Sequence, residues 1–204
     1  MLRRVAPALL MALALLAGCG DDAPLTIEQP IDGATVVKRI DKAVREAGTG
    51  RARAQDGTNE YTWDLSGPGR LRFLSHSTRV ESRQIGDTVY QRAAGGTIWV
   101  RLSFDKPIQP VSELSYFKNR QATEVSVDGV VTKYVVEVPA RLFEGQEDTS
   151  QDAKLAVTIF VDADGLPRRT TVEGDGLAGA NFTDWGDPMT IDKPAKSVDG
   201  DKKR

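Results

Sequence analysis

The residues of this chain that could carry nucleophilic catalysis are few. The only histidine, His76, lies between Ser75 and Ser77. A serine nucleophile needs a base that a third group orients, whereas adjacent residues of a strand project to opposite faces of a sheet. With one histidine and one cysteine, the chain also lacks the side chains of a structural zinc site. The sequence therefore predicts no enzyme activity and no metal site.

A second motif, Asp162-Ala163-Asp164-Gly165, resembles the beginning of a calcium-binding loop. An EF-hand loop supplies about six oxygen ligands over about twelve residues and ends in a bidentate glutamate. Leu166-Pro167-Arg168-Arg169 follows instead, so we expect a β-turn here. The chain contains no P-loop, CxxC or HExxH pattern. The sequence indicates no dissociable cofactor.

The single cysteine has a different chemistry. Arg3 and Arg4 precede an apolar run of 12 residues, Val5 to Leu16. This run is shorter than the roughly 20 residues that cross a bilayer and is typical of a secretory signal peptide. Leu16-Ala17-Gly18-Cys19 then matches the bacterial lipobox. We predict a lipoprotein signal peptide over residues 1–18 and a covalent diacylglyceryl anchor on Cys19.

The anchor on Cys19 predicts a location. Two acyl chains hold a protein stably on a membrane, so the mature chain is expected on the extracytoplasmic face of the cell membrane. The alternative, an ordinary free thiol, leaves an unpaired cysteine in an oxidising compartment. No basic residue flanks Cys19, so no patch for anionic lipids is expected there. The net charge of −2, from 27 basic and 29 acidic side chains, gives no support to nucleic-acid binding.

The rest of the chain has room for one domain. Of its 204 residues, 40% are hydrophobic and 27% are charged, as in ordinary soluble domains. Residues 19–31 contain Pro24 and Pro30 and little apolar pattern, so we expect the lipidated cysteine and a flexible tether. Residues 32–191 are the expected domain, which we expect to be monomeric. Residues 192–204 are almost entirely polar and are expected to be a disordered tail.

The domain begins with a long helix, because apolar residues recur every three or four positions while charged residues fill the other face. The apolar positions are Val36, Val37, Ile40, Val44 and Ala47. Asp32 is the expected N-cap, and Gly48 is the expected left-handed residue at the C-terminal end. This helix must bury its apolar stripe against a partner.

After Gly50 the period changes to two, and turn residues separate short runs at intervals typical of an antiparallel meander. A short helix is expected within residues 112–119, and an acidic excursion over residues 140–153. We expect about eleven strands, over residues 51–56, 60–66, 69–75, 77–85, 88–93, 97–103, 121–128, 130–139, 154–162, 167–173 and 178–184.

Side chains that alternate along these strands make one face of the sheet apolar throughout. The opposite face is only partly polar, with Arg70 and Arg72 but also Trp99. About eleven strands with one long helix to cover them favour a deeply curled sheet around a cavity. The alternative is a solid core that side chains fill by themselves, and the sequence leaves both open.

Several motifs of the strands and turns form a further pattern. They are Gly86-Asp87-Thr88-Val89-Tyr90 with Thr97-Ile98-Trp99-Val100, then Ile159 to Arg169 with its Asp-Gly-Leu-Pro turn, then Phe182 to Pro188 with its Asp-Trp-Gly sequence, up to Pro194. Together they resemble the actinobacterial LppX/LprAFG lipoprotein family. The resemblance covers roughly residues 33–194 and concerns the fold, not catalysis.

The resemblance implies an α+β fold. It is a curled antiparallel half-barrel, like the LolA and LolB lipoprotein carriers, with one long N-terminal helix and short helices against its concave face and an apolar cavity inside. Studied members of the family bind acylated lipids or glycolipids and help to move them toward the outer envelope. Segments 104–120 and 140–153 match weakly, and they would border the cavity mouth.

The apolar sheet face and the resemblance together predict a lipid carrier, anchored in the membrane of the cell envelope, whose cargo is an acylated lipid or glycolipid. An envelope protein is a further expected partner. The alternative is a surface interaction or sensor lipoprotein with a filled core and no lipid cargo. The predicted cavity lining consists of Trp63, Leu71, Phe73, Ile98, Val100, Val136, Val157 and Ile159.

Overall fold

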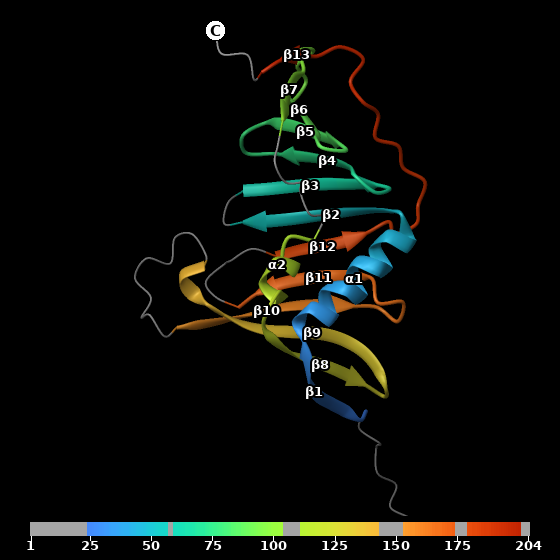
Figure 1. The fold of residues 1–204 in the computed structure, drawn as a ribbon, viewed down its shortest axis with the longest axis vertical. Helices are drawn as coiled ribbons and strands as arrows, with labels where there is room; N and C mark the ends of the chain where they lie inside the picture. Colours follow the sequence, from blue (N-terminus) through green and yellow to red (C-terminus); the bar gives the residue numbers. More distant parts are fainter. Residues whose placement is uncertain (1–23, 57–58, 104–110, 143–152, 174–178, 201–204) are drawn as a thin grey trace, which may run out of the picture.

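The structure, a computed structural model, describes residues 24–56, 59–103, 111–142, 153–173 and 179–200. Within these ranges thirteen strands form one open sheet, and two α-helices lie against one of its faces (Figure 1). In chain order the elements are β1 (Thr26–Asp32), α1 (Gly33–Ala47), β2 (Thr49–Asp56), β3 (Asn59–Ser66), β4 (Arg70–Ser75), β5 (Val80–Ile85), β6 (Thr88–Ala93), β7 (Val100–Ser103), α2 (Leu114–Phe117), β8 (Gln121–Val127), β9 (Val130–Pro139), a 3₁₀ turn η1 (Ala140–Leu142), β10 (Lys154–Val161), β11 (Pro167–Val172), β12 (Gly179–Thr183) and β13 (Val198–Asp199).

The order of the strands across the sheet is β1-β8-β9-β10-β11-β12-β2-β3-β4-β5-β6-β7-β13. Neighbouring strands run antiparallel, except that β13 runs parallel to β7. This is the predicted α+β fold, a curled antiparallel sheet that does not close. We call the face that α1 covers the concave face and the opposite one the convex face. The predicted strands are all found, and β1 and β13 add two more.

The tether predicted over residues 19–31 is wrong from Thr26 onward, because Thr26–Asp32 forms β1 and pairs with β8 along its whole length. The side chains of this edge strand are almost all exposed, so it has no apolar alternation for the sequence to reveal. Pro30 is tolerated because an edge strand has one side without a hydrogen-bonded neighbour. Residues 19–23, with Cys19, lie outside the described residues.

The disordered tail predicted from residue 192 is also wrong as far as residue 200. Residues 187–200, which we call the C-terminal strap, run past the turns of the central strands and end in β13 (red in Figure 1). Side chains of the sheet hold the strap by its backbone: Ser66 Oγ donates to Met189 O at 2.6 Å, and Arg70 Nη1 donates to Ile191 O at 2.9 Å. Such contacts use carbonyl groups that every residue has, so composition does not reveal them. Residues 201–204 lie outside the described residues.

Helix α1 has the predicted position and the predicted apolar face. Val36, Ile40 and Val44 are buried, and the helix ends at Gly48, which has φ +75° and donates its N–H to Val44 O at 3.1 Å. Asp32 occupies the N-cap position, but its side chain makes no capping hydrogen bond to the backbone. Burying an aliphatic side chain of this size contributes about 1.5–3 kcal/mol. The stripe therefore holds α1 on the concave face.

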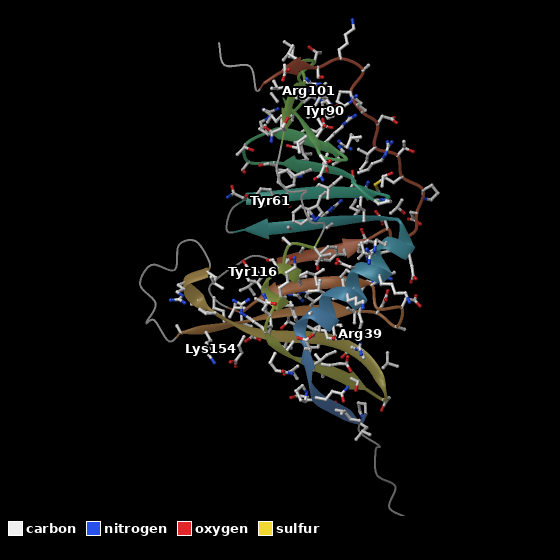
Figure 2. All side chains as sticks on the ribbon, in the orientation of Figure 1. Arg39, Tyr61, Tyr90, Arg101, Tyr116 and Lys154 are labelled. Atoms are coloured by element: carbon white, nitrogen blue, oxygen red, sulfur yellow. The ribbon has the colours of Figure 1, made fainter. Side chains whose placement is uncertain are left out.

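A polar contact also holds α1 against the edge of the sheet formed by β1 and β8. Arg39 on α1, labelled in Figure 2, pairs with Glu124 on β8. The side chain of Glu124 is buried, and its Oε1 accepts a second hydrogen bond from Gln29 Nε2 at 2.6 Å. A buried carboxylate needs such partners, because an unpaired charge away from water is costly. Helix α1, β1 and β8 are therefore tied together at one edge of the sheet.

The start of α1 packs against the end of α2 at Gly33. Its N–H donates to Arg120 O at 2.9 Å. A Cβ atom at this position would lie 2.0 Å from Phe117 O and 2.7 Å from Arg120 O. These oxygens belong to the backbone and cannot rotate away, so only glycine fits between the two helices.

We expect Gly33→Ala to lower the free energy of unfolding by about 1–3 kcal/mol, the usual cost of overpacking. Alanine is the better helix former by about 1 kcal/mol, so propensity alone gives the opposite sign. Urea unfolding followed by circular dichroism measures the difference. Ala34→Gly, at the exposed neighbouring position, is the control and should cost no more than about 1 kcal/mol. Equal or greater stability of Gly33→Ala contradicts the packing argument.

Candidate functional site

The strand register places the predicted lining residues on one face, with the exception of Ile98. Val157 pairs with Val136, Trp63 pairs with Phe73, and Phe73 pairs with Ser82 on the next strand. All of these lie on the concave face, beneath or beside α1 and α2. Ile98 lies outside the strands and is 68% exposed. The strand predicted to begin at residue 97 starts only at Val100, and Val100 is half-buried.

The residues on the concave face fall into two groups. Val136, Val157 and Ile159 are at most 1% exposed and belong to the core beneath α1 and α2. The protein's own side chains fill this half of the face, so these three would touch a ligand only if a helix moved. The sequence could not separate them from the other lining candidates, because both groups have the same strand alternation.

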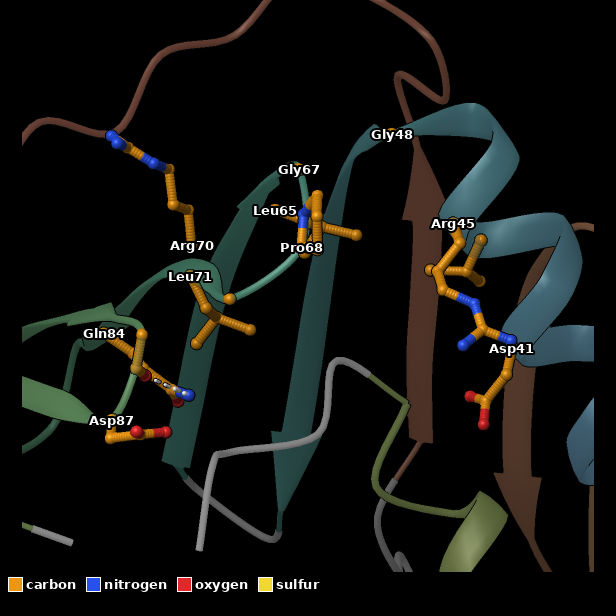
Figure 3. A pocket seen from close by; sticks show the side chains of 13 residues that line it. Asp41, Arg45, Gly48, Leu65, Gly67, Pro68, Arg70, Leu71, Gln84 and Asp87 are labelled. Carbon is orange, nitrogen blue, oxygen red and sulfur yellow. Dashed lines mark hydrogen bonds between the residues drawn. The ribbon is translucent and has the colours of Figure 1, made fainter.

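The second group consists of Trp63, Leu71 and Phe73, on the two strands, β3 and β4, that border a cavity. A cavity of about 420 Å³ opens between the C-terminal end of α1 and the turns that join β3 to β4 and β5 to β6 (Figure 3). Val44, Leu65 and Leu71 give it apolar surface, and Arg45 and Asp87 are among its charged residues. This volume is within the range of sites that bind small molecules. Of the predicted lining residues, Leu71 borders this cavity directly.

An aromatic row continues the apolar surface away from the cavity. Phe73 stacks on Tyr61 with ring centroids 5.4 Å apart and on Trp63 with centroids 5.8 Å apart. Leu65 and Leu71 line the cavity and also border a small apolar void beside Trp63. The indole N–H of Trp63 is buried and has no hydrogen-bond partner within the described structure. The concave face is thus apolar from the cavity to the aromatic row.

The convex face of the same strands carries charge. The carboxylate of Glu81 on β5, which is 4% exposed, accepts hydrogen bonds from Arg83 Nε at 3.1 Å and Arg92 Nε at 2.9 Å. The guanidinium groups of Arg83 and Arg92 also lie 4.7 and 4.4 Å from the ring centroid of Trp99. Cation–π contact of this kind favours burial of the indole. Of the residues predicted on this face, Arg72, which lies 3.2 Å from Glu81, and Trp99 belong to this network, whereas Arg70 donates to Ile191 O of the strap.

The pKa of Glu81 is shifted by opposing causes. Burial raises it, because the charged form loses solvation, but hydrogen bonds from Arg92 and Arg83 and the charge of Arg72 together lower it below 4.5. A carboxyl group whose pKa is lower in the folded state stabilises the fold above its unfolded pKa. That contribution is lost as the pH falls through the lower, folded value.

The motifs first considered for catalysis or metal binding have structural roles. His76 Nε2 lies 3.0 Å from Thr62 Oγ1, while Ser75 Oγ accepts a hydrogen bond from Thr78 Oγ1 at 2.7 Å. Asp162 Oδ1 accepts the N–H of Leu166 at 2.9 Å and so closes the predicted turn. Across the described ranges no three His, Cys, Asp or Glu side chains are grouped to hold a metal ion.

Two sequence features fall partly outside the described residues. Segments 104–120 and 140–153, expected at the cavity mouth, are described only over 111–120, 140–142 and residue 153. Gly174, Gly176 and Gly179 have the spacing of a dinucleotide fingerprint. That fingerprint requires a strand followed by a helix, whereas Gly179 is the first residue of strand β12, and Gly174 and Gly176 lie outside the described residues.

The chain was compared with known proteins. No family model matches it, and no curated protein matches it. Among solved structures it is similar to LprF from Mycobacterium bovis, with 15% identity, a TM-score of 0.44, and coverage of 80% of this chain and 97% of LprF. It is also similar to lipoprotein LppX from Mycobacterium tuberculosis, with 17% identity, a TM-score of 0.48, and coverage of 78% of this chain and 98% of LppX.

These similarities concern the fold. Both names fall within the LppX/LprAFG family, which the sequence motifs resemble. At such identities a shared fold does not carry a shared ligand.

Within the ranges that the structure describes, the helices are too short or too polar to cross a membrane.

Measurements of unfolding free energy can test which of the predicted lining residues lie in the filled core. Ile159→Ala should lower the free energy of unfolding by about 2–5 kcal/mol, because it leaves a void in a filled core. Ile98→Ala, the same substitution at an exposed member of the set, should change it by less than about 0.5 kcal/mol. Denaturant unfolding measures both. Equal effects at the two positions contradict the division.

The charge network predicts a pH dependence. Glu81→Gln should lower the free energy of unfolding at pH 7 by about 1–3 kcal/mol, because buried charge-assisted hydrogen bonds are lost. The difference from the unsubstituted protein should shrink as the pH falls from about 4.5, the ordinary value of a glutamate, through the lower folded-state pKa of Glu81, because the stabilising charge is then lost. Thermal unfolding across pH 3 to 8 checks this.

Glu137→Gln is the matched control for Glu81→Gln. Glu137 pairs with Lys154 at 3.1 Å, but both side chains are about two-thirds exposed, at 67% and 65%. Exposed ion pairs contribute about 0–1 kcal/mol, so this variant should be close to the unsubstituted protein at pH 7. A loss as large as that of Glu81→Gln would show that burial of the network has no particular effect.

Proposed function

We propose that this chain is a membrane-anchored bacterial lipoprotein of the LppX/LprAFG type, which binds an acylated lipid or glycolipid on its concave face and carries or presents it in the cell envelope. One observation carries the proposal. The apolar concave face of β3 and β4 borders an open cavity of about 420 Å³ at the end of α1, where the helices do not fill the sheet.

The physical gain from binding an acyl chain is large enough for this role. Burying one CH₂ group contributes about 0.8 kcal/mol, so a chain of about sixteen carbons gains on the order of 12 kcal/mol before ordering costs. Binding and release of such a chain involve no covalent step. Leu65, Leu71 and the row of Tyr61, Trp63 and Phe73 supply the apolar surface in this proposal.

The polar part of the lipid would remain at the rim of the cavity. Arg45 extends from α1 at this rim and has no ion-pair partner among the described residues (Figure 3). Arg70 lies across the cavity, and Asp41 and Asp87 add negative charge. Guanidinium groups bind phosphate and sugar oxygens through several N–H donors. We assign Arg45 to the headgroup of the lipid.

The anchor would keep the cavity near its source of lipid. From Cys19 to Thr26, where β1 begins, an extended chain spans at most about 25 Å. The edge of the sheet at β1 would therefore lie within that distance of the membrane, provided that Cys19 carries the predicted diacylglyceryl group. The expected location is the extracytoplasmic face of the cell membrane.

A second candidate function rests on the filled half of the concave face. Val136, Val157 and Ile159 are buried by the protein itself, as in a module whose core has no room for cargo. Such a protein would present its surface to an envelope protein instead of carrying lipid. The two candidates differ in whether lipid is recovered with the purified protein.

We expect that the domain from Asp21 onward, expressed in a host rich in its natural lipids, carries extra mass under native conditions that disappears on denaturation. Mass spectrometry of the intact protein, with lipid extraction, measures this. Leu65→Asn should weaken lipid retention about tenfold, because an unpaired amide would replace apolar surface at the cavity. A bare mass under both conditions, also after incubation with envelope lipids, would favour the interaction module.

Leu74→Asn provides the matched control for Leu65→Asn. Leu74 is half-buried like Leu65, but it lies on the convex face and pairs with Thr62. The two variants should lose similar stability, and only Leu65→Asn should lose lipid. Equal lipid loss in both would place the ligand elsewhere or assign the effect to unfolding.

A further inference from the structure

The convex face contains a hollow that the lipid-binding proposal does not use. It has a volume of about 170 Å³ and is lined by Arg51 and Arg53 of β2, Thr62 and Asp64 of β3, and Arg72 and Leu74 of β4. The register brings these side chains together, because Arg53 pairs with Thr62 and Asp64 pairs with both Arg51 and Arg72. Three guanidinium groups from two strands therefore surround one small space.

Asp64 fixes two of the three arginines. Its side chain is 9% exposed; Oδ1 accepts a hydrogen bond from Arg51 Nε at 2.8 Å, and Oδ2 lies 3.5 Å from Arg72 Nη1. A guanidinium group has five N–H donors, so each arginine keeps donors that this carboxylate does not use. The buried carboxylate thus holds two guanidinium groups side by side at the hollow.

The hollow keeps an excess of positive charge. Its lining has three arginines against one aspartate, a net +2. Counting also the side chains that ion pairs join to this lining, Arg83 and Arg92 add two charges while Glu81 and Asp184 subtract two, so the excess within the ion-paired network remains +2. Arg53 is exposed and has no ion-pair partner within the described ranges. Arg53 therefore adds to the hollow a guanidinium group that the carboxylate of Asp64 does not hold.

We propose that the hollow formed by Arg51, Arg53 and Arg72 binds a phosphate group. Planar guanidinium groups match the oxygens of a phosphate through paired N–H donors, and the Thr62 hydroxyl offers a further hydrogen bond. The site lies on the opposite face of the sheet from the cavity, so it does not depend on the lipid-binding proposal. The phosphate could come from an anionic lipid headgroup or from a soluble phosphate.

The same register extends the basic row across the convex face. Arg53 pairs with Asn181, Asn181 with Arg169, Arg169 with Phe160, and Phe160 with Lys133. Arg53, Arg169 and Lys133 are therefore separated by two strands each, about 10 Å. A surface of anionic lipids offers several phosphates to such a row, whereas a soluble phosphate would use only the hollow.

Calorimetric titration of the full-length chain with inorganic phosphate, at low ionic strength, tests the site. We expect saturable binding that Arg53→Gln weakens about tenfold. Because Arg53 is exposed and unpaired, this variant should fold normally, which circular dichroism verifies. Lys38→Gln, an exposed position on α1 with the same loss of charge, is the control and should bind as before. Absence of binding, or equal losses in both variants, overturns the proposal.

Vesicles distinguish the two sources of phosphate. The domain from Asp21 onward, which lacks both Cys19 and the predicted signal peptide, is sedimented with phosphatidylglycerol or phosphatidylcholine vesicles. A preference for phosphatidylglycerol that Arg53→Gln abolishes supports a lipid headgroup as the ligand. Equal binding to both vesicles, with Arg53-dependent binding of inorganic phosphate, supports a soluble phosphate. A preference for phosphatidylglycerol that Arg53→Gln leaves unchanged overturns the role of the hollow at a membrane.

Discussion

The rest of the structure depends on how α1 covers the concave face of the sheet. The helix has fifteen residues, and the described part of the chain forms a sheet of thirteen strands, so one helix cannot bury the whole apolar face. Over β8 to β2, the stripe of Val36, Ile40 and Val44 meets side chains that are fully buried. Beyond the end of α1 the same face borders a cavity instead. The filled core and the candidate site both arise because α1 is too short to cover the whole sheet.

The two faces of the central strands serve different purposes. On the concave face, β3 and β4 present Leu65, Leu71 and the aromatic row. On the convex face, the same strands present Asp64 and Arg72, which join the buried ion-pair network. Alternation of side chains along a strand makes this possible without any conflict between the faces. The C-terminal strap then accepts hydrogen bonds from Arg70 and Arg83, and so holds the outer strands.

Much of the fold could be predicted from periodicity. The long helix over Gly33–Ala47 and the eleven strands of the meander follow from spacings of 3.6 and two residues and from glycine at the turns. The tether and the tail were predicted wrongly as structureless, because the side chains of β1 are almost all exposed and the strap beyond Ile191 is held largely through backbone hydrogen bonds. Neither segment shows the apolar alternation that marks the other strands. For the candidate lining residues, the sequence identified the correct face of the sheet. It did not identify which of these residues the protein's own side chains bury.

By itself, the sequence determined which residues are apolar on one side of the chain and how long each element can be, because these depend on neighbours a few positions apart. The motif Leu16-Ala17-Gly18-Cys19 also predicts a lipid anchor on Cys19. Only the tertiary structure decided that Ile159 is core while Leu71 borders a cavity, since that depends on where α1 ends above the sheet. It likewise brought Arg53 beside Arg51 and Arg72, because strand pairing, rather than sequence separation, sets which side chains meet.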